Sequence, residues 1–410
     1  MARDNIKFNK FMLLFKAINE KNFKLNIYFL RIIFLSSFLI ISYNFSYWVS
    51  VKSFFEYSDW LINYQGGFTR RGLIGEILYH IHTVSGIGLN YILFVFVVVA
   101  YGVFFFILYK MVTSIKLNFI NTLIIFSPLS FIYMPLSKTL AGRKEIFFFL
   151  LITIFFYKLR KIKFEKVKYW IIFISLVTSL THLGFIFYIP YLILFFIYLN
   201  PDKNLKEISL QILPILMVMF FILVGMLYAT IYSKADINII CNSIKDFTNA
   251  CPQDTYLEVF TLSVTDIMGM VVEFSKNQYF IKYPIYYILS FTPIYLSFFN
   301  LKENEKYKTK KLITFLIISS ILTLPVFVLG GDYGRYIHWQ YICYLLIYIY
   351  TLNSKILEQP SNNNFFKNKI NYLILSSVIF FYSFFWSVPH CCDKNYSFLY
   401  DKIFIRLFIN

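Results

Sequence analysis

The segment YILFVFVVVAYGVFFFILY, residues 91–109, contains no charged side chain and is long enough to cross a hydrocarbon core of about 30 Å as a helix. It is typical of the whole chain. Apolar residues make up 59% of the sequence and aromatic residues 22%, only 15% are charged, and the mean hydropathy is +0.63. This composition indicates an integral membrane protein rather than a soluble domain.

Further apolar runs recur on both sides of this segment and predict about eleven transmembrane helices. Because lipid offers no partners to backbone polar groups, we expect an all-α polytopic bundle that forms one integral membrane domain over 1–410. The predicted spans cover 27–49, 91–109, 118–134, 146–157, 169–181, 184–199, 208–230, 283–300, 312–329, 340–354 and 370–388.

The distribution of Lys and Arg predicts the orientation of the bundle. The formal net charge is +18, and the basic residues lie in short clusters between the apolar runs. They are more numerous on the side that carries the amino terminus, which favours a cytoplasmic amino terminus. We interpret this positive charge as a determinant of the orientation of the chain relative to anionic membrane lipid. We therefore expect no nucleic-acid partner. The segments predicted to face outward are 50–90, 135–145, 231–282, 330–339 and the tail 389–410.

No cleavable signal peptide is evident, because the apolar run after the basic amino terminus is too long and lacks a small-residue cleavage site. We therefore expect the first span to stay as an anchor. Four of the five cysteines fall in predicted outer segments, where an oxidising compartment permits disulfides. A bridge between Cys241 and Cys251 is one prediction, and a bridge from this loop to Cys391 or Cys392 is the competing one. The spacing is poor for zinc, and nothing in the sequence calls for a metal or another cofactor.

Unusual polar residues collect in the predicted outer segments. The first contains YQGGFTRRGLIGE (64–76), with the adjacent pair Arg70 and Arg71. Later segments contain Arg143 in AGRKEI (141–146), His182 in THLGF (181–185) and Asp332 with Arg335 in GGDYGRYIHW (330–339). Separate loops thus bring acids, guanidinium groups and an imidazole to one membrane surface, where a bundle would form a polar site at its mouth.

The arginines predict an anion site. A pair of guanidinium groups flanked by glycines suits a diphosphate, because it offers bidentate donors and permanent charge. The alternative is that Arg70 and Arg71 lie at the membrane interface, with the apolar parts of their side chains along lipid and their guanidinium groups in water. Arg143 contacts a ligand in one interpretation and lies at the headgroup level near a helix start in the other.

Two carboxylates are candidates for a general base. Asp59 follows the first span and could take a proton from an attacking hydroxyl, or could be a solvated loop acid. Asp332 is the rival, although its spacing also allows a local ion pair with Arg335. His182 is a third catalytic candidate, with helix packing as the alternative.

These segments, in this order, resemble the polytopic polymerases and glycosyltransferases of bacterial surface polysaccharides, especially the O-antigen polymerase group. The resemblance implies that glycan on undecaprenyl diphosphate is polymerised at the periplasmic face of the inner membrane. It implies that outer-loop arginines, here Arg70, Arg71, Arg143 and Arg335, bind diphosphate, and that a chain-length regulator is a partner.

One feature departs from that group. An acidic outer loop directly after the first span is more similar to GT-C superfamily transferases, which use one lipid-phosphate sugar donor, and this similarity implies that Asp59 is the base. Two other classes stay open, a flippase for lipid-linked oligosaccharide and a structural membrane subunit. A flippase would place charged residues along its spans, whereas here the spans are nearly free of them apart from Arg31.

Overall fold

The described part of the chain is helical. The computed structural model describes residues 27–52, 55–69, 71–115, 117–136, 141–232, 235–249, 269, 272, 279–299, 306–357, 377–383, 386 and 388, and no strand occurs among them. The α-helices are α2 (Ile27–Val51), α3 (Phe55–Leu61), α4 (Leu73–Ser85), α5 (Leu89–Thr113), α6 (Phe119–Ile125), α7 (Tyr133–Leu136), α8 (Glu145–Lys158), α9 (Phe164–Thr181), α10 (Ile189–Leu199), α11 (Leu205–Tyr232), α12 (Ile237–Ile244), α14 (Tyr279–Phe299), α15 (Lys306–Leu322), α16 (Leu324–Leu329) and α17 (Tyr333–Asn353). Two 3-10 helices, η1 (Leu159–Lys161) and η2 (Leu183–Tyr188), follow α8 and α9.

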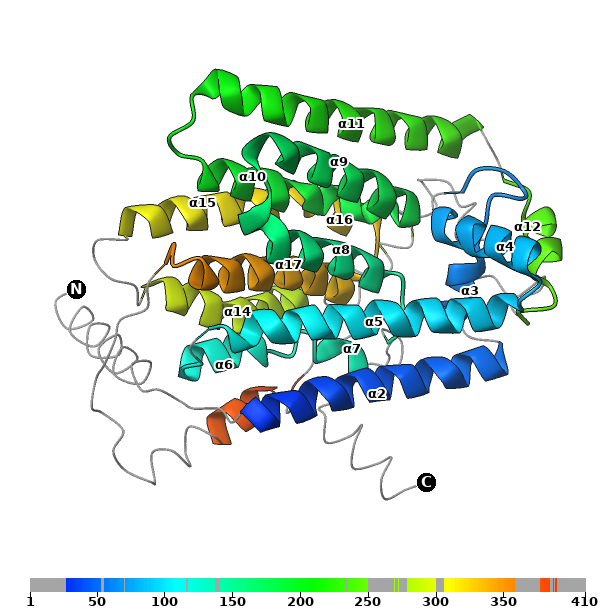
Figure 1. Cartoon of the computed structure of the whole chain (residues 1–410), viewed down its shortest axis with the longest axis horizontal. Coiled ribbons are helices and arrows are strands. Elements are labelled where there is room, and N and C mark those ends of the chain that lie inside the picture. Colours follow the sequence, from blue (N-terminus) through cyan, green and yellow to red (C-terminus); the bar gives the residue numbers. More distant parts are fainter. Residues whose placement is uncertain are drawn as a thin grey trace.

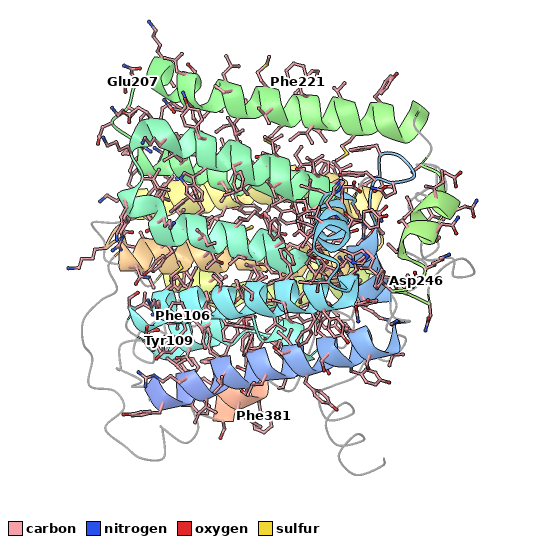
Figure 2. All side chains as sticks on the ribbon, turned by 45° about the vertical axis from the view of Figure 1, so that its right-hand side comes forward. Phe106, Tyr109, Glu207, Phe221, Asp246 and Phe381 are labelled. Carbon is pink, nitrogen blue, oxygen red and sulfur yellow. The ribbon has the colours of Figure 1, made fainter. Side chains whose placement is uncertain are left out.

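The long helices lie side by side with their axes in nearly one direction (Figure 1). Within the described residues, four helical stretches are long and apolar enough to cross a membrane: Tyr28–Val51, Leu89–Thr113, Leu205–Met226 and Tyr307–Val328. Phe221 on α11 projects from the outside of the bundle (Figure 2), with 62% of its side chain exposed, as expected of a lipid-facing residue. The prediction of an all-helical protein with membrane-length helices is confirmed, whereas eleven spans and a cytoplasmic amino terminus stay predictions.

Helix α17 forms the centre of the bundle. It packs against α8, α14 and α5, and nearly all of its residues are buried. Its tyrosine hydroxyls need acceptors there, because an unpaired buried polar group is costly. Tyr341 donates to the carbonyl of Ile124 at 2.7 Å, and Tyr348 donates to Oδ1 of Asn121 at 2.6 Å.

These acceptors lie on α6, at the start of a segment predicted from the sequence as one helix over 118–134. That prediction is wrong in detail: α6 ends at Ile125, residues 126–132 are not helical, and α7 begins at Tyr133. Pro128 explains the break, because proline has no backbone N–H and disfavours helical backbone in the residue before it. The carbonyl of the buried Leu129 in this break accepts a 2.7 Å hydrogen bond from Nδ1 of His338 on α17.

The first outer segment, expected as a loop, contains α3 and α4. Together with α12 they form a small layer at one end of the bundle (Figure 1), which we call the cap. Hydrogen bonds join its parts: Tyr57 donates to the carbonyl of Phe247 at 2.9 Å, and the backbone N–H of Asp236 donates to the carbonyl of Gly66 at 2.7 Å. The segment 235–249 therefore holds α3 and the glycine-rich turn in place.

The glycines of the cap allow close approach of its backbone segments. A side chain at Gly75 would overlap the carbonyl oxygen of Ile62, and a side chain at Gly66 would overlap that of Asp236. Glycine is thus required at Gly66 and Gly75 for the close packing of α3, α4 and α12 in the cap.

Candidate functional site

A buried ion-pair cluster lies beneath the cap, where the chain enters α4 and α8. Asp59 on α3 has 5% of its surface exposed. Its Oδ1 lies 3.6 Å from Nη1 of Arg71, just before α4, and 3.7 Å from Nζ of Lys144, just before α8. Nζ of Lys144 also donates a 2.7 Å hydrogen bond to the carbonyl of Arg71. The segment before α8, more than 70 positions further along the chain, thus meets α3 and the segment before α4 at one carboxylate.

The charges in this cluster shift one another's proton affinities. Burial raises the pKa of the Asp59 carboxyl, but Lys144, Arg71, Arg143 and Arg335 act in the opposite direction and bring the pKa below its ordinary value of 3.8. Burial lowers the pKa of the Lys144 ammonium to about 8, although the attraction of Asp59 opposes this. Asp59 is therefore ionised at neutral pH, whereas Lys144 loses its proton in mildly alkaline solution.

A second group of charges begins α17. Arg335 pairs through Nη2 with Glu145, the first residue of α8, and through Nη1 with Oδ2 of Asp332 at 2.9 Å. The local Asp332–Arg335 pair that the spacing allows is present. All three side chains are buried, so removing one of them would leave another charge without its partner.

His182 lies at the carboxyl end of α9 and faces the same region. Its Nδ1 accepts a 3.1 Å hydrogen bond from the backbone N–H of Gly184, and its ring packs edge-on to Trp339, with centroids 5.1 Å apart. Burial, followed by the charges of Arg71, Lys144 and Arg143, lowers the pKa of His182 well below 6.5. The ring is therefore neutral with its proton on Nε2, which makes His182 a hydrogen-bond donor at that atom.

Polar atoms near the start of α17 lack hydrogen-bond partners among the described residues. They include two donors, Nε of Arg335 and Nε1 of Trp339, and one acceptor, Nε2 of His338. Buried polar atoms in native proteins are nearly always bonded, so these three atoms need partners outside the described residues, such as ordered water.

The structure brings together most residues predicted for the site. Asp59 and Arg71 are in contact, Arg143 is buried close enough to lower the pKa of Asp59, and His182 lies within the influence of the same cations. Arg70 lies outside the described residues.

Asp332 and Arg335 form the adjoining group described above, in which Arg335 contacts both Asp332 and Glu145. The sequence analysis did not single out Lys144 or Glu145, which contact Asp59 and Arg335. Their charges in AGRKEI were the available signal, but the order of three consecutive charges does not show which of them points inward.

The cysteine predictions are tested only in part. Cys241 on α12 is disulfide-bonded and buried against Ile62 of the cap. Cys251, Cys391 and Cys392 lie outside the described residues, so pairing of Cys241 with Cys251 stays a prediction. Within the described ranges no three His, Cys, Asp or Glu residues are placed to hold a metal ion.

Comparison with protein-family models, curated proteins and solved structures finds no match to this chain. The geometry of the cluster must therefore carry the functional argument.

Proposed function

We propose that this chain is a membrane glycosyltransferase that takes a sugar from an undecaprenyl-phosphate or undecaprenyl-diphosphate carrier at the cap end, which would face the periplasm of a bacterial inner membrane. The observation that carries the proposal is the buried contact of Asp59 with Arg71 and Lys144. Sugar transfer from a phosphate carrier needs a base for the acceptor hydroxyl and, next to it, cations that bind the phosphate.

The reaction would proceed by displacement at the anomeric carbon. The acceptor hydroxyl oxygen forms a bond to this carbon while its proton passes to the Asp59 carboxylate. The bond from the anomeric carbon to the carrier phosphate oxygen breaks, and its electron pair leaves with the phosphate. Arg71 and Lys144 stabilise that charge, and Nε2 of His182 can donate a further hydrogen bond to the phosphate or sugar.

Binding of the donor would also activate the base. In the structure Arg71 and Lys144 lower the pKa of Asp59, which makes it a weak proton acceptor. A phosphate that binds the same two cations competes with the carboxylate for their charge, so the pKa of Asp59 rises towards its ordinary range. The carboxylate then accepts the hydroxyl proton more readily, and only when the donor is in place.

The charge arrangement favours transfer from one lipid-phosphate donor, in the manner of GT-C enzymes, over polymerisation. Polymerisation requires two lipid diphosphates at once. Arg335, a candidate for the second diphosphate, is already engaged by Glu145 and Asp332. Arg71 and Lys144 contact the same carboxylate, so one phosphate bound between them would compete with Asp59 for both cations.

The test is the surface glycan of a strain that lacks the native gene and receives wild type, Asp59→Asn or Arg71→Ala at equal membrane abundance. Asp246→Asn and Lys245→Ala, both exposed on the segment after α12, make matched changes of charge outside the cluster. We expect the deletion strain to make glycan that lacks one sugar, and expect only wild type and the two control variants to restore it.

If the deletion strain and the site variants instead lose long glycan chains and keep only single repeats, the protein is a polymerase that uses the same site. Accumulation of lipid-linked glycan on the cytoplasmic side would identify a flippase and contradict the proposal. Full activity of Asp59→Asn would exclude Asp59 as the base.

A further inference from the structure

A second basic site lies at the end of the bundle opposite the cap. There the ends of α5, α8 and α17 line a half-open cavity of about 430 Å³, and Lys110 and Arg160 at its edge are exposed. Its polar lining comprises Lys110, Ser114, Arg160 and Asn353, and Phe156 and Tyr350 supply apolar surface.

The two cations of this cavity have no acidic partner in the part of the chain that the structure describes. None of the ion pairs there involves Lys110 or Arg160. Nζ of Lys110 lies 4.3 Å from the ring centre of Phe106, and Nε of Arg160 donates to Oγ of Ser354 at 2.8 Å. This bond uses one of the five N–H donors of the guanidinium. Within the described residues the cavity therefore carries two positive charges that no carboxylate neutralises.

Groups other than these cations also cap the helix ends here. Lys and Arg often neutralise the last carbonyls of helices, and all three helices end here. However, Nδ2 of Asn353 already donates to the carbonyl of Met111 at 3.0 Å, and the backbone N–H of Ser354 donates to that of Tyr350 at 2.8 Å. Oγ of Ser114 donates to Oδ1 of Asn353 at 2.8 Å and fixes the polar floor of the cavity.

The cavity adjoins the end of the apolar stretch Leu89–Thr113, where a membrane-spanning helix would meet lipid headgroups. Phe106, one helical turn before Lys110, is 57% exposed on the apolar surface of α5. Figure 2 shows Phe106 and Tyr109 towards the same end as Glu207 and away from Asp246 in the cap segment. Lys110 can thus lay its stem along the lipid-facing surface and extend its ammonium to the headgroups.

We propose that this cavity binds a phosphate-bearing anion between Lys110 and Arg160. Cations at this depth suit the phosphate of an anionic phospholipid, with the glycerol portion against Phe156 and Tyr350. A soluble phosphate or diphosphate would be recognised by the same chemistry. The site is separate from the cap and does not depend on the proposed glycosyl transfer.

The experiment is native mass spectrometry of the full chain in detergent with phosphatidylglycerol or phosphatidylcholine, with and without inorganic pyrophosphate. Lys110→Gln with Arg160→Gln is compared with Lys158→Gln and Lys168→Gln. The control pair removes the same charge near the same end, from side chains that lie over Trp170 and Tyr169.

We expect wild type and the control pair to prefer phosphatidylglycerol, and expect the cavity variant to bind it about 10- to 30-fold more weakly. Displacement of phosphatidylglycerol by pyrophosphate would identify a soluble anion as a ligand, and resistance to displacement would identify the lipid. Equal binding of phosphatidylglycerol by both double variants, with no effect of pyrophosphate, would overturn the proposal.

Discussion

At the scale of single residues, Lys144 makes the cluster sensitive to pH. Its ammonium is buried between Asp59 and the carbonyl of Arg71, and burial lowers its pKa from 10.5 to about 8. The folded protein therefore holds this proton less tightly than the unfolded chain does. The Lys144 contribution to stability rises with pH between about 8 and 10.5, because in that range the unfolded state binds more protons.

If Lys144 holds the donor phosphate, transfer activity should fall as the pH rises through about 8, because the neutral amine loses its attraction for phosphate. Lys144→Arg keeps the charge at any accessible pH and should move this decline to higher pH. The measurement is the rate of sugar transfer by purified protein between pH 6 and 10. An identical decline in wild type and Lys144→Arg would show that another group titrates. Unfolding at high pH is checked by circular dichroism of the same samples.

Glu145 supports the second charge group through Arg335. Glu145→Gln would leave the buried guanidinium with only Asp332, and loss of one partner from a buried pair typically costs about 3 to 5 kcal/mol. We expect a clearly lower midpoint of thermal unfolding in detergent. Glu207→Gln, which removes an exposed acid paired with Lys203, should change the midpoint little. Equal midpoints for the two variants would contradict a structural role for Glu145.

Sequence alone could nominate residues but not their partners. Asp59, Arg71 and Arg335 stand out because charge is rare in an apolar chain and these charges fall between spans. Their pairing is a tertiary property. The engagement of Arg335 by Glu145 joins α17 to α8 across nearly 200 positions of sequence, and no local pattern encodes that contact.

At the scale of elements, the cap depends on close contact between α3 and α4. Gly75→Ala would place a methyl group against the carbonyl of Ile62, and such overpacking typically costs about 1 to 3 kcal/mol. Gly225→Ala on α11 meets no atom within 4 Å and should be neutral or slightly stabilising. Thermal unfolding of both variants, followed by intrinsic fluorescence, tests this difference. A stable Gly75→Ala protein would show that α4 can move away from α3 at little cost.

Hydropathy predicted helices well where the chain is uniformly apolar, and less well where backbone chemistry intervenes. The span predicted at 91–109 is α5 with short extensions, and that at 27–49 is α2. The run over 312–329 lies in the membrane-length stretch Tyr307–Val328, where a single turn residue next to Pro325 separates α15 from α16, whereas the run over 118–134 divides next to Pro128. The cap helices were missed because their apolar face packs on protein in a segment too polar to span a membrane.

At the scale of the whole molecule, the described parts of the predicted outer segments 50–90, 135–145, 231–282 and 330–339 gather at one end. Contacts of Asp59 with Arg71 and Lys144, together with those of the cap, join segments that the positive-inside pattern placed on one side. The basic turns after α8 and α10 lie at the other end (Figure 1). Hydropathy and charge could predict this segregation because each span reverses the direction of the chain. They could not predict how deeply α17 is buried, although its Arg, His, Gln and many Tyr side chains make it more polar than α5 or α11.

This segregation allows a direct test of orientation. Glu207 and Asp246 lie at opposite ends of the bundle (Figure 2), and both are exposed. If the cap faces outward, a membrane-impermeant maleimide should label Asp246→Cys in intact spheroplasts and label Glu207→Cys only after permeabilisation. The unsubstituted protein gives the background, with Cys343 buried and Cys241 in a disulfide.

The reverse pattern would invert the orientation and place the Asp59 cluster in the cytoplasm, where a nucleotide sugar rather than a lipid-linked donor would be the available substrate. Labelling of both positions from outside would show that the bundle does not separate its two ends across a membrane, and the membrane-spanning arrangement itself would then be wrong.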